Sequence, residues 1–201
     1  MQIYHIQNVL RQILEGVSYL HAHGYAHRDL KPSNVLVNIE EVVKIADFGL
    51  AKKMRPYATT KVCTMWYRAP ELILGFKNYS TKIDMWSVGC IASEMVLGNP
   101  FFYEEDTDSK CIGRIFELMG TPDTNNWEEE CKANATNYDL MKPKKSYNNT
   151  YAWVLSKKSP IRFQKEFELL ELIDHMLQIN PTSRWSAEEC LSHSFFSLTF
   201  E

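Results

Sequence analysis

Residues 27 to 34 read His-Arg-Asp-Leu-Lys-Pro-Ser-Asn and bring an acid, basic groups and a carboxamide into one short segment. An apolar, helix-like run precedes this segment and a strand-like run follows it. Polar groups held in a stiff loop at the edge of a core are typical of catalytic sites. We therefore start from this loop and ask what chemistry its side chains would support.

Asp29, Lys31, Asn34 and the later Asp47 suit the transfer of a phosphoryl group. A carboxylate and a carboxamide oxygen are ligands that Mg²⁺ accepts, so Asn34 and Asp47 would hold the metal if they converge. Asp29 would accept the proton of a hydroxyl group, and Lys31 would stabilise developing negative charge. Positioning and charge neutralisation provide most of the catalysis in phosphoryl transfer.

Two elements must position these side chains. Apolar residues recur every three or four positions from residue 3 to residue 20, which predicts an amphipathic helix ending near Gly24. Two apolar runs, 35–37 and 42–46, flank a polar turn and predict a small hairpin. Because Asn34 precedes the first run and Asp47 follows the second, the hairpin would bring these two residues together.

The rest of the chain predicts a mainly α domain with short β-hairpins. Helical spacing or capping residues indicate helices over residues 71–74, 83–97, 110–119, 163–179 and 187–192. The helix over 83–97 is apolar enough to be central and buried. Residues 50–64 are basic and weakly patterned, so we expect a long surface loop. Residues 124–158 show no period and are expected to form an irregular insertion within a domain spanning residues 1–201.

Composition limits the function and the compartment. The 201 residues carry a formal net charge of −3, which gives no electrostatic reason to expect a nucleic acid partner. No segment approaches the run of about 18 apolar residues that would cross a membrane. The five cysteines are odd in number and lack a Cys-x-x-Cys pair, so we expect reduced thiols in a cytoplasmic or nuclear protein.

At these motifs the chain resembles the eukaryotic protein kinase family. Residues 27–34 resemble the catalytic loop, 47–49 (Asp-Phe-Gly) the magnesium-binding motif, and 69–71 (Ala-Pro-Glu) the end of the activation segment. Asp84-x-Trp86-Ser-x-Gly89 and Arg184 match landmarks of the family's large lobe. The resemblance covers essentially residues 1 to 200. It implies a mainly helical large lobe and ATP-dependent phosphorylation of Ser or Thr in proteins.

The resemblance also implies a role for each matching residue. Asp29 would accept or orient the substrate hydroxyl, Lys31 would contact the γ-phosphate of ATP, and Asn34 and Asp47 would hold Mg²⁺. Leu36 would form the floor under the adenine ring. The remaining matches imply structural roles: a buried Glu71–Arg184 salt bridge, support of the catalytic loop by Asp84, and packing of His27 on Phe48.

Residues 66–71 (Trp-Tyr-Arg-Ala-Pro-Glu) resemble the group of cyclin-dependent and mitogen-activated kinases. Lys61 stands where mitogen-activated kinases carry a phosphorylated tyrosine, so that switch is not expected here. The apolar Met65 before Trp66, and Gly-Thr-Pro-Asp at 120–123, resemble the cyclin-dependent branch. In that group Arg68 would cap a backbone carbonyl near Cys63, so that proline, which lacks an N–H, fits after the target residue. We therefore expect proline-directed specificity and, as a candidate activator, a cyclin-type protein.

Thr59 occupies the place of the activating phosphothreonine of cyclin-dependent kinases, with Thr60 as the adjacent alternative. A phosphate on Thr59 would pair with Arg28. The second arginine that the family uses here is Lys52 in this chain, and lysine makes a point-charge contact in place of a bidentate one.

Protein kinases also need a small lobe that holds the phosphates of ATP. Its Gly-rich loop and strand lysine are not found in this sequence, so we expect the chain to represent the large lobe alone. Two alternatives stay open beside an active kinase of the cyclin-dependent type: a non-catalytic binding module, and another branch of the same kinase group.

Overall fold

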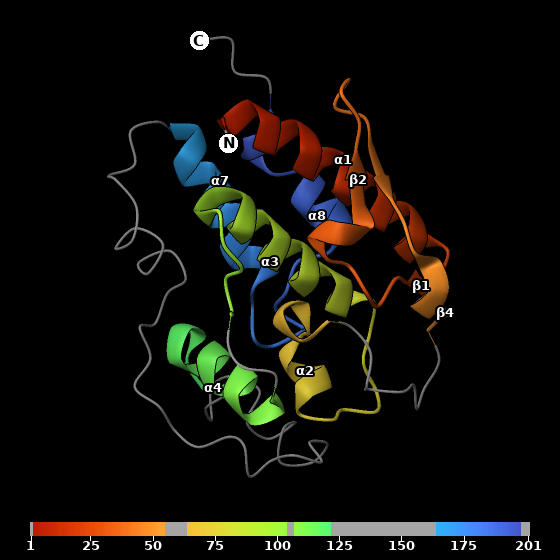
Figure 1. Cartoon of the computed structure of the whole chain (residues 1–201), viewed down its shortest axis with the longest axis vertical. Coiled ribbons are helices and arrows are strands. Elements are labelled where there is room, and N and C mark those ends of the chain that lie inside the picture. The colour runs from red at the N-terminus through yellow and green to blue at the C-terminus, as the bar shows by residue number, and fades with distance from the viewer. Residues whose placement is uncertain (1, 55–63, 104–106, 122–163, 198–201) are drawn as a thin grey trace.

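The computed structural model describes residues 2–54, 64–103, 107–121 and 164–197. Figure 1 shows a mainly helical molecule with a small β region at one side. The predicted insertion over 124–158 lies outside the described residues. So do Thr59, Thr60, Lys61 and Cys63, so the roles expected of them stay predictions.

Helix α1 (Ile3–Ala22) is the predicted amphipathic helix. Its apolar positions form one buried stripe (Ile6, Val9, Leu10, Ile13, Leu14 and Val17). Gly24 follows the helix with φ of +75°, a conformation that glycine adopts without steric cost. The chain can therefore turn directly from α1 into the catalytic loop.

The predicted hairpin is confirmed. Strand β2 (Val35–Val37) pairs antiparallel with β3 (Val43–Ile45), with Leu36 opposite Lys44. A second pair joins β1 (Tyr25–Ala26) to β4 (Lys52–Lys53). The expectation of a loop over 50–64 is thus wrong at its start, because two-residue strands are too short to show a period.

The predicted central helix is confirmed as α3 (Lys82–Leu97), of which eleven residues from Ile83 to Ser93 are buried. Gly98, with φ of +81°, ends it. Around it lie α2 (Pro70–Ile73), α4 (Asp108–Met119), α7 (Gln164–Met176) and α8 (Ala187–Leu191). Figure 1 shows α3 across the middle of the molecule, where it packs against α1 and α7, while α8 packs against α1.

Buried side chains from all of these helices form one continuous core. Phe101, Phe102, Phe195 and Phe196 are buried in it, as expected of core anchors. None of the described helices is both long and apolar enough to cross a bilayer.

Candidate active site

The loop over residues 27–34 is held from below by Asp84, in the first turn of α3. The backbone N–H of His27 donates to Asp84 Oδ2 at 2.8 Å, and that of Arg28 donates to Oδ1 at 2.9 Å. Arg28 has φ of 68°, which a residue with a side chain adopts only when its surroundings hold it there. Asp84 therefore makes the supporting contact that the resemblance implied.

Asp29 lies at the centre of a compact polar cluster. Lys31 Nζ donates to Asp29 Oδ2 at 2.7 Å and to Thr64 Oγ1 at 3.1 Å. The backbone N–H of Thr64 donates to Asp29 Oδ1 at 3.1 Å, and its hydroxyl donates to the same oxygen at 3.2 Å. The structure thus brings the predicted catalytic pair together and adds Thr64.

These contacts keep Asp29 ionised. Burial by itself raises the pKa of the Asp29 carboxyl, but the hydrogen bond and charge of Lys31 and the hydrogen bonds of Thr64 outweigh burial and lower that pKa below its usual value. An ionised carboxylate is the form that can accept a proton from a hydroxyl group.

Asn34 and Asp47 lie at the same end of the hairpin. Val35 pairs with Ile45, and one residue further along each strand Ala46 N donates to Asn34 O at 2.9 Å. Asp47 follows Ala46 and therefore lies at the same end of the hairpin as Asn34. Asp47 has φ of 60° and accepts from Gly49 N, so its exposed carboxylate is fixed by a left-handed turn.

The donor set at this end of the hairpin fits Mg²⁺. Asn34 Nδ2 donates to Asp29 O at 2.8 Å, and no donor from the described part of the chain reaches the Asn34 side-chain oxygen. One amide oxygen and one exposed carboxylate are hard oxygen ligands that leave room for phosphate oxygens and water. Asn34 and Asp47 would hold the metal, which when bound would neutralise phosphate charge.

The expected packing of His27 on Phe48 is present, with ring centroids 4.9 Å apart. His27 Nε2 also lies 2.9 Å from Ala46 O, so the ring joins the catalytic loop to the Asp-Phe-Gly segment. Leu36 is 55% exposed on β2 and Phe48 is 48% exposed. An exposed apolar side chain at this place is compatible with the predicted contact of Leu36 with adenine.

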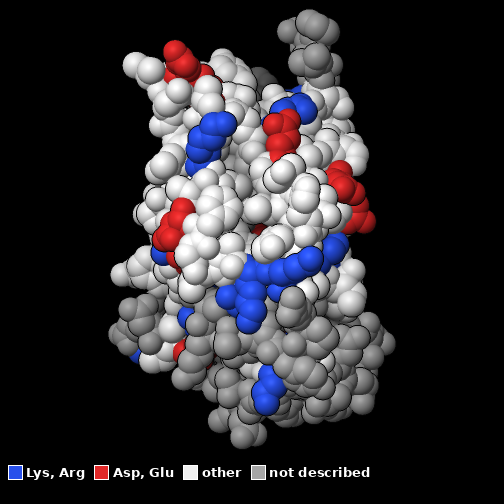
Figure 2. Space-filling model, turned by 90° about the vertical axis from the view of Figure 1, so that its right-hand side faces the viewer, with Lys and Arg blue, Asp and Glu red and all other residues white. Residues whose placement is uncertain are grey.

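Arg28 connects the catalytic loop to two other segments. Its Nε donates to Leu50 O at 2.7 Å and its Nη1 to Tyr79 Oη at 3.1 Å. Lys52 is exposed on the short β4 strand nearby. Figure 2, which views the molecule from the right-hand side of Figure 1, shows a band of Lys and Arg side chains across this face. A band of positive charge is suited to a phosphate group.

The segment that would contact the residue after the target Ser or Thr is anchored to two helices. Tyr67 Oη donates to Glu94 Oε2 at 2.7 Å, and Ser87 Oγ donates to Tyr67 O at 2.8 Å, both on α3. Burial together with Glu94 raises the pKa of the Tyr67 phenol well above its usual value, so this bond persists at any physiological pH. Arg68 Nη1 pairs with Asp108 Oδ1 of α4 at 3.0 Å.

The Glu71–Arg184 salt bridge is present and buried. Arg184 Nη1 lies 2.7 Å from Glu71 Oε1 and Nη2 lies 3.0 Å from Oε2, a bidentate arrangement. The two side chains are 0% and 2% exposed. The Arg184 guanidinium also lies over the Trp86 ring, 5.2 Å from its centroid. This cluster fixes the end of the 64–71 segment to the core.

Sequence reasoning did not assign roles to Thr64, Asp108 or His21. Thr64 lies thirty-five positions from Asp29, and its hydroxyl meets the carboxylate only through the fold. Asp108 and His21 likewise reach Arg68 and Asp84 from other helices. The sequence marked His21 and Asp108 only as polar residues near the ends of predicted helices, and Thr64 only as the last residue of the expected 50–64 loop.

The sequence profile of the protein kinase domain matches residues 1–196. The chain belongs to the protein kinase family. It is 39% identical over 201 residues to CTD kinase subunit alpha of Schizosaccharomyces pombe, and 39% identical over 196 residues to cyclin-dependent kinase G-2 of Oryza sativa subsp. indica. The family assignment and the similarity to cyclin-dependent kinases therefore agree with the resemblance noted in the motifs.

A solved structure supports the fold. The yeast RNA Pol II CTD kinase CTDK-1 complex contains a chain that matches with a TM-score of 0.84 and 34% identity, over 95% of this chain and 62% of that one. The two curated relatives are matched over 96% and 95% of this chain but only 32% and 27% of their own lengths. This chain thus spans about a third or less of those relatives.

Proposed function

We propose that this chain supplies the catalytic loop and the metal-binding residues of a protein serine/threonine kinase of the cyclin-dependent type. The observation that carries the proposal is the cluster in which Lys31 and Thr64 hold the Asp29 carboxylate beside Asn34. Asp29 orients the substrate hydroxyl and takes its proton, Lys31 neutralises charge on the transferring phosphate, and Asn34 with Asp47 binds Mg²⁺ of MgATP.

The first experiment measures nucleotide binding by this chain. MgATP should raise its melting temperature, because a ligand that binds only the folded state stabilises that state. Asp47→Asn should abolish the Mg²⁺-dependent part of the shift, and Ser33→Ala, a change at an exposed residue of the same loop, should leave it intact. No shift with the wild-type chain would favour the alternative of a non-catalytic binding module.

The second experiment measures transfer by the complete kinase that contains this chain. Asp29→Asn should lower kcat by about a hundredfold or more, since general-base and positioning contributions are typically about 10² to 10⁴. An Asp29→Asn kinase as active as the wild type would contradict the role assigned to Asp29. Activity that appears only with a cyclin-type protein would support the predicted activator, and activity without one would favour another branch of the group.

Proline-directed specificity belongs to the same proposal. Arg68 and Cys63 are the residues expected to shape the pocket for the residue after the target, and Arg68 is anchored on Asp108. Two relatives carry the name CTD kinase, so peptides from the RNA polymerase II CTD are suitable candidate substrates. A peptide library without a preference for proline at the position after Ser or Thr would overturn this part. A cytoplasmic or nuclear location remains a prediction.

Control by phosphorylation is the last part of the proposal. The buried Arg28 and the exposed Lys52 both carry a positive charge, which supports a phosphate-binding role. Thr59 or Thr60 would be the residue that is phosphorylated. Mass spectrometry of active kinase should find phosphate on one of these threonines. Full activity with both residues unmodified would exclude control by phosphorylation at these two threonines.

A further inference from the structure

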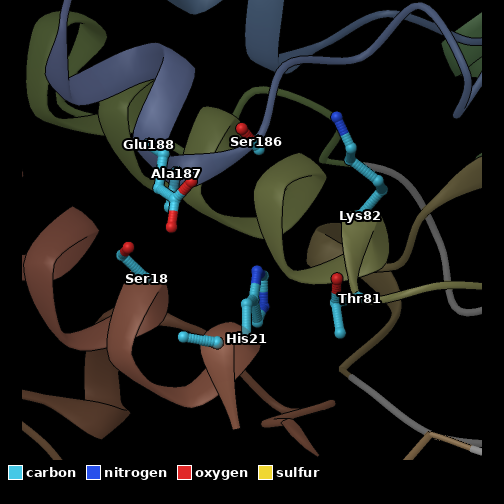
Figure 3. A pocket seen from close by; sticks show the side chains of 8 residues that line it. Ser18, His21, Thr81, Lys82, Ser186, Ala187 and Glu188 are labelled. Atoms are coloured by element: carbon cyan, nitrogen blue, oxygen red, sulfur yellow. The ribbon is translucent and has the colours of Figure 1, made fainter. Parts of the chain in front are cut away.

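A cavity of about 180 Å³ lies between α1, the start of α3 and α8, and its lining includes neither Asn34 nor Asp47. Figure 3 shows its walls: Ser18 and His21 of α1 on one side, Thr81 and Lys82 at the start of α3 on another, and Glu188 of α8 above. None of the residues that line the cavity takes part in the proposed transfer reaction. Its importance comes from what the His21 ring does at its wall.

His21 Nε2 lies 2.9 Å from Asp84 Oδ2, within the range of a strong hydrogen bond. The same oxygen accepts from His27 N, and the other carboxylate oxygen accepts from Arg28 N. Asp84 is 1% exposed and the His21 side chain is 12% exposed. One buried carboxylate therefore receives two backbone N–H groups of the catalytic loop and one imidazole N–H.

The imidazole is the only side chain, among the described residues, that pairs with the Asp84 carboxylate. A carboxylate buried without sufficient donors is costly, so loss of one donor favours rotation or hydration of the group. Either change would weaken the bonds to His27 N and Arg28 N. Arg28 would be affected most, because its left-handed backbone depends on being held.

We propose that His21 is a positioning residue for the Asp29 loop, acting through Asp84. It contacts neither the substrate nor Asp29. It sets the orientation of the Asp84 carboxylate, which accepts the hydrogen bonds of the loop. The cavity gives the proposal a direct test. Its volume lies at the wall formed by His21, so a variant that lacks the ring opens a space into which free imidazole can bind.

The readout is hydrogen exchange of the His27 and Arg28 amides, measured by NMR on the chain itself. In His21→Ala both amides should exchange about ten- to a hundredfold faster, the factor that corresponds to loss of a charge-assisted hydrogen bond. Added imidazole should restore protection, and His21→Gln, whose amide N–H can replace Nε2–H, should retain most of it. The Leu172 amide of buried α7 should be unaffected throughout.

His23→Ala is the matched control. His23 is exposed just after the end of α1, and its ring lies 2.7 Å from Tyr19 O of that helix. In this variant the His27 and Arg28 amides should exchange at the rates of the wild type. Unchanged exchange of the His27 and Arg28 amides in His21→Ala would overturn the proposal. So would equal acceleration at Leu172 that imidazole does not reverse, which would indicate a merely structural role.

The complete kinase provides a second readout, which rests on the proposed function. His21→Ala should lower kcat about tenfold with KM for ATP changed by less than about twofold, because the weakened bonds hold His27 and Arg28 and not Asn34 or Asp47. Imidazole should restore kcat. An inactive wild-type kinase would count against the proposed function alone, since the exchange experiment decides the role of His21 without catalysis.

Discussion

At the scale of single residues, the ionisation of Asp29 is the property most open to experiment. Its folded-state pKa is lowered, so its contribution to stability is present above the ordinary aspartate pKa and is lost as pH falls through the lowered value. The carboxylate needed for proton transfer therefore persists throughout the physiological range.

Lys31→Met should raise the pKa of Asp29, because it removes a hydrogen bond and a positive charge while burial remains. The measurement is a carboxyl-carbon NMR titration of the chain, with Lys110→Met on the exposed surface of α4 as control. An unchanged midpoint for Asp29 would show that Thr64 alone maintains the ionised form.

Glu71→Gln should lower the free energy of unfolding by about 3–5 kcal/mol, because it leaves the Arg184 guanidinium buried without its charge partner. Chemical denaturation measures this change. Glu117→Gln, which breaks the half-exposed Arg114–Glu117 pair on α4, should cost less than about 1 kcal/mol. Equal losses in the two variants would contradict the importance of burial.

Residue types and order predicted that Asp29, Lys31, Asn34 and Asp47 belong to one candidate site, because these residues lie in short contiguous motifs. The partners that orient them were not predictable. Thr64 and His21 act through contacts that span thirty-five and sixty-three positions, and no local pattern encodes such contacts.

At the scale of elements, two glycines in long helices differ in what an added methyl group would meet. A Cβ at Gly89 of α3 would lie 2.9 Å from Leu177 Cγ and 3.0 Å from Met176 Cβ, atoms close to the backbone beside α7. A Cβ at Gly16 of α1 would meet the end of the Ile45 side chain, Cδ1, at 2.9 Å. The α3–α7 contact therefore depends on a small residue, while the α1–β3 contact can adjust.

Gly89→Ala should destabilise the chain by about 1–3 kcal/mol, since overpacking outweighs the better helix propensity of alanine. Gly16→Ala should be neutral or stabilising by up to about 1 kcal/mol, since Ile45 can move. Thermal unfolding of both variants tests the difference. A stable Gly89→Ala variant would mean that α7 shifts away at little cost.

Helix α8 has a complete capping box, in which Ser186 Oγ accepts from Glu189 N and the Glu189 carboxylate accepts from Ser186 N. Ser186→Ala should cost about 0.5–2 kcal/mol. Ser194→Ala, an exposed serine in the next turn, is the control and should have little effect. Urea denaturation that finds the two variants equal would contradict a stabilising cap.

The long helices and the hairpin were predictable from periodicity, and their bounds differ from the expected ones by a few residues. Helix α7 ends at Met176, three positions before the predicted end, and Leu177 and Ile179 stay buried although they lie beyond the helix. The β1–β4 pair was missed because its register is set by the surrounding fold and not by its own residues.

At the scale of the whole molecule, the two ends of the described chain are joined. Arg11 and Gln7 of α1 donate to the carbonyls of Phe196 and Phe195, and Lys165 of α7 donates to Ser194 O at 2.9 Å. Phe195 is fully buried at this junction. Helices from the start and the end of the chain thus share one core.

Phe195→Ala should cost about 3–5 kcal/mol, the usual loss for a phenylalanine removed from a core. Tyr4→Ala, at a side chain that is 62% exposed on α1, should cost far less. Equilibrium denaturation monitored by circular dichroism measures both. Similar losses would show that the junction is not tightly packed.

The support of the catalytic loop by Asp84 also has a consequence for biosynthesis. The loop at residues 27–34 is synthesised before Asp84, and Arg184, which fixes the 64–71 segment through Glu71, is added later still. Contacts between such distant positions form slowly and only after the intervening chain exists. The reactive geometry is therefore among the last features that a nascent chain acquires, and a polypeptide released early carries the catalytic motif without the catalytic arrangement.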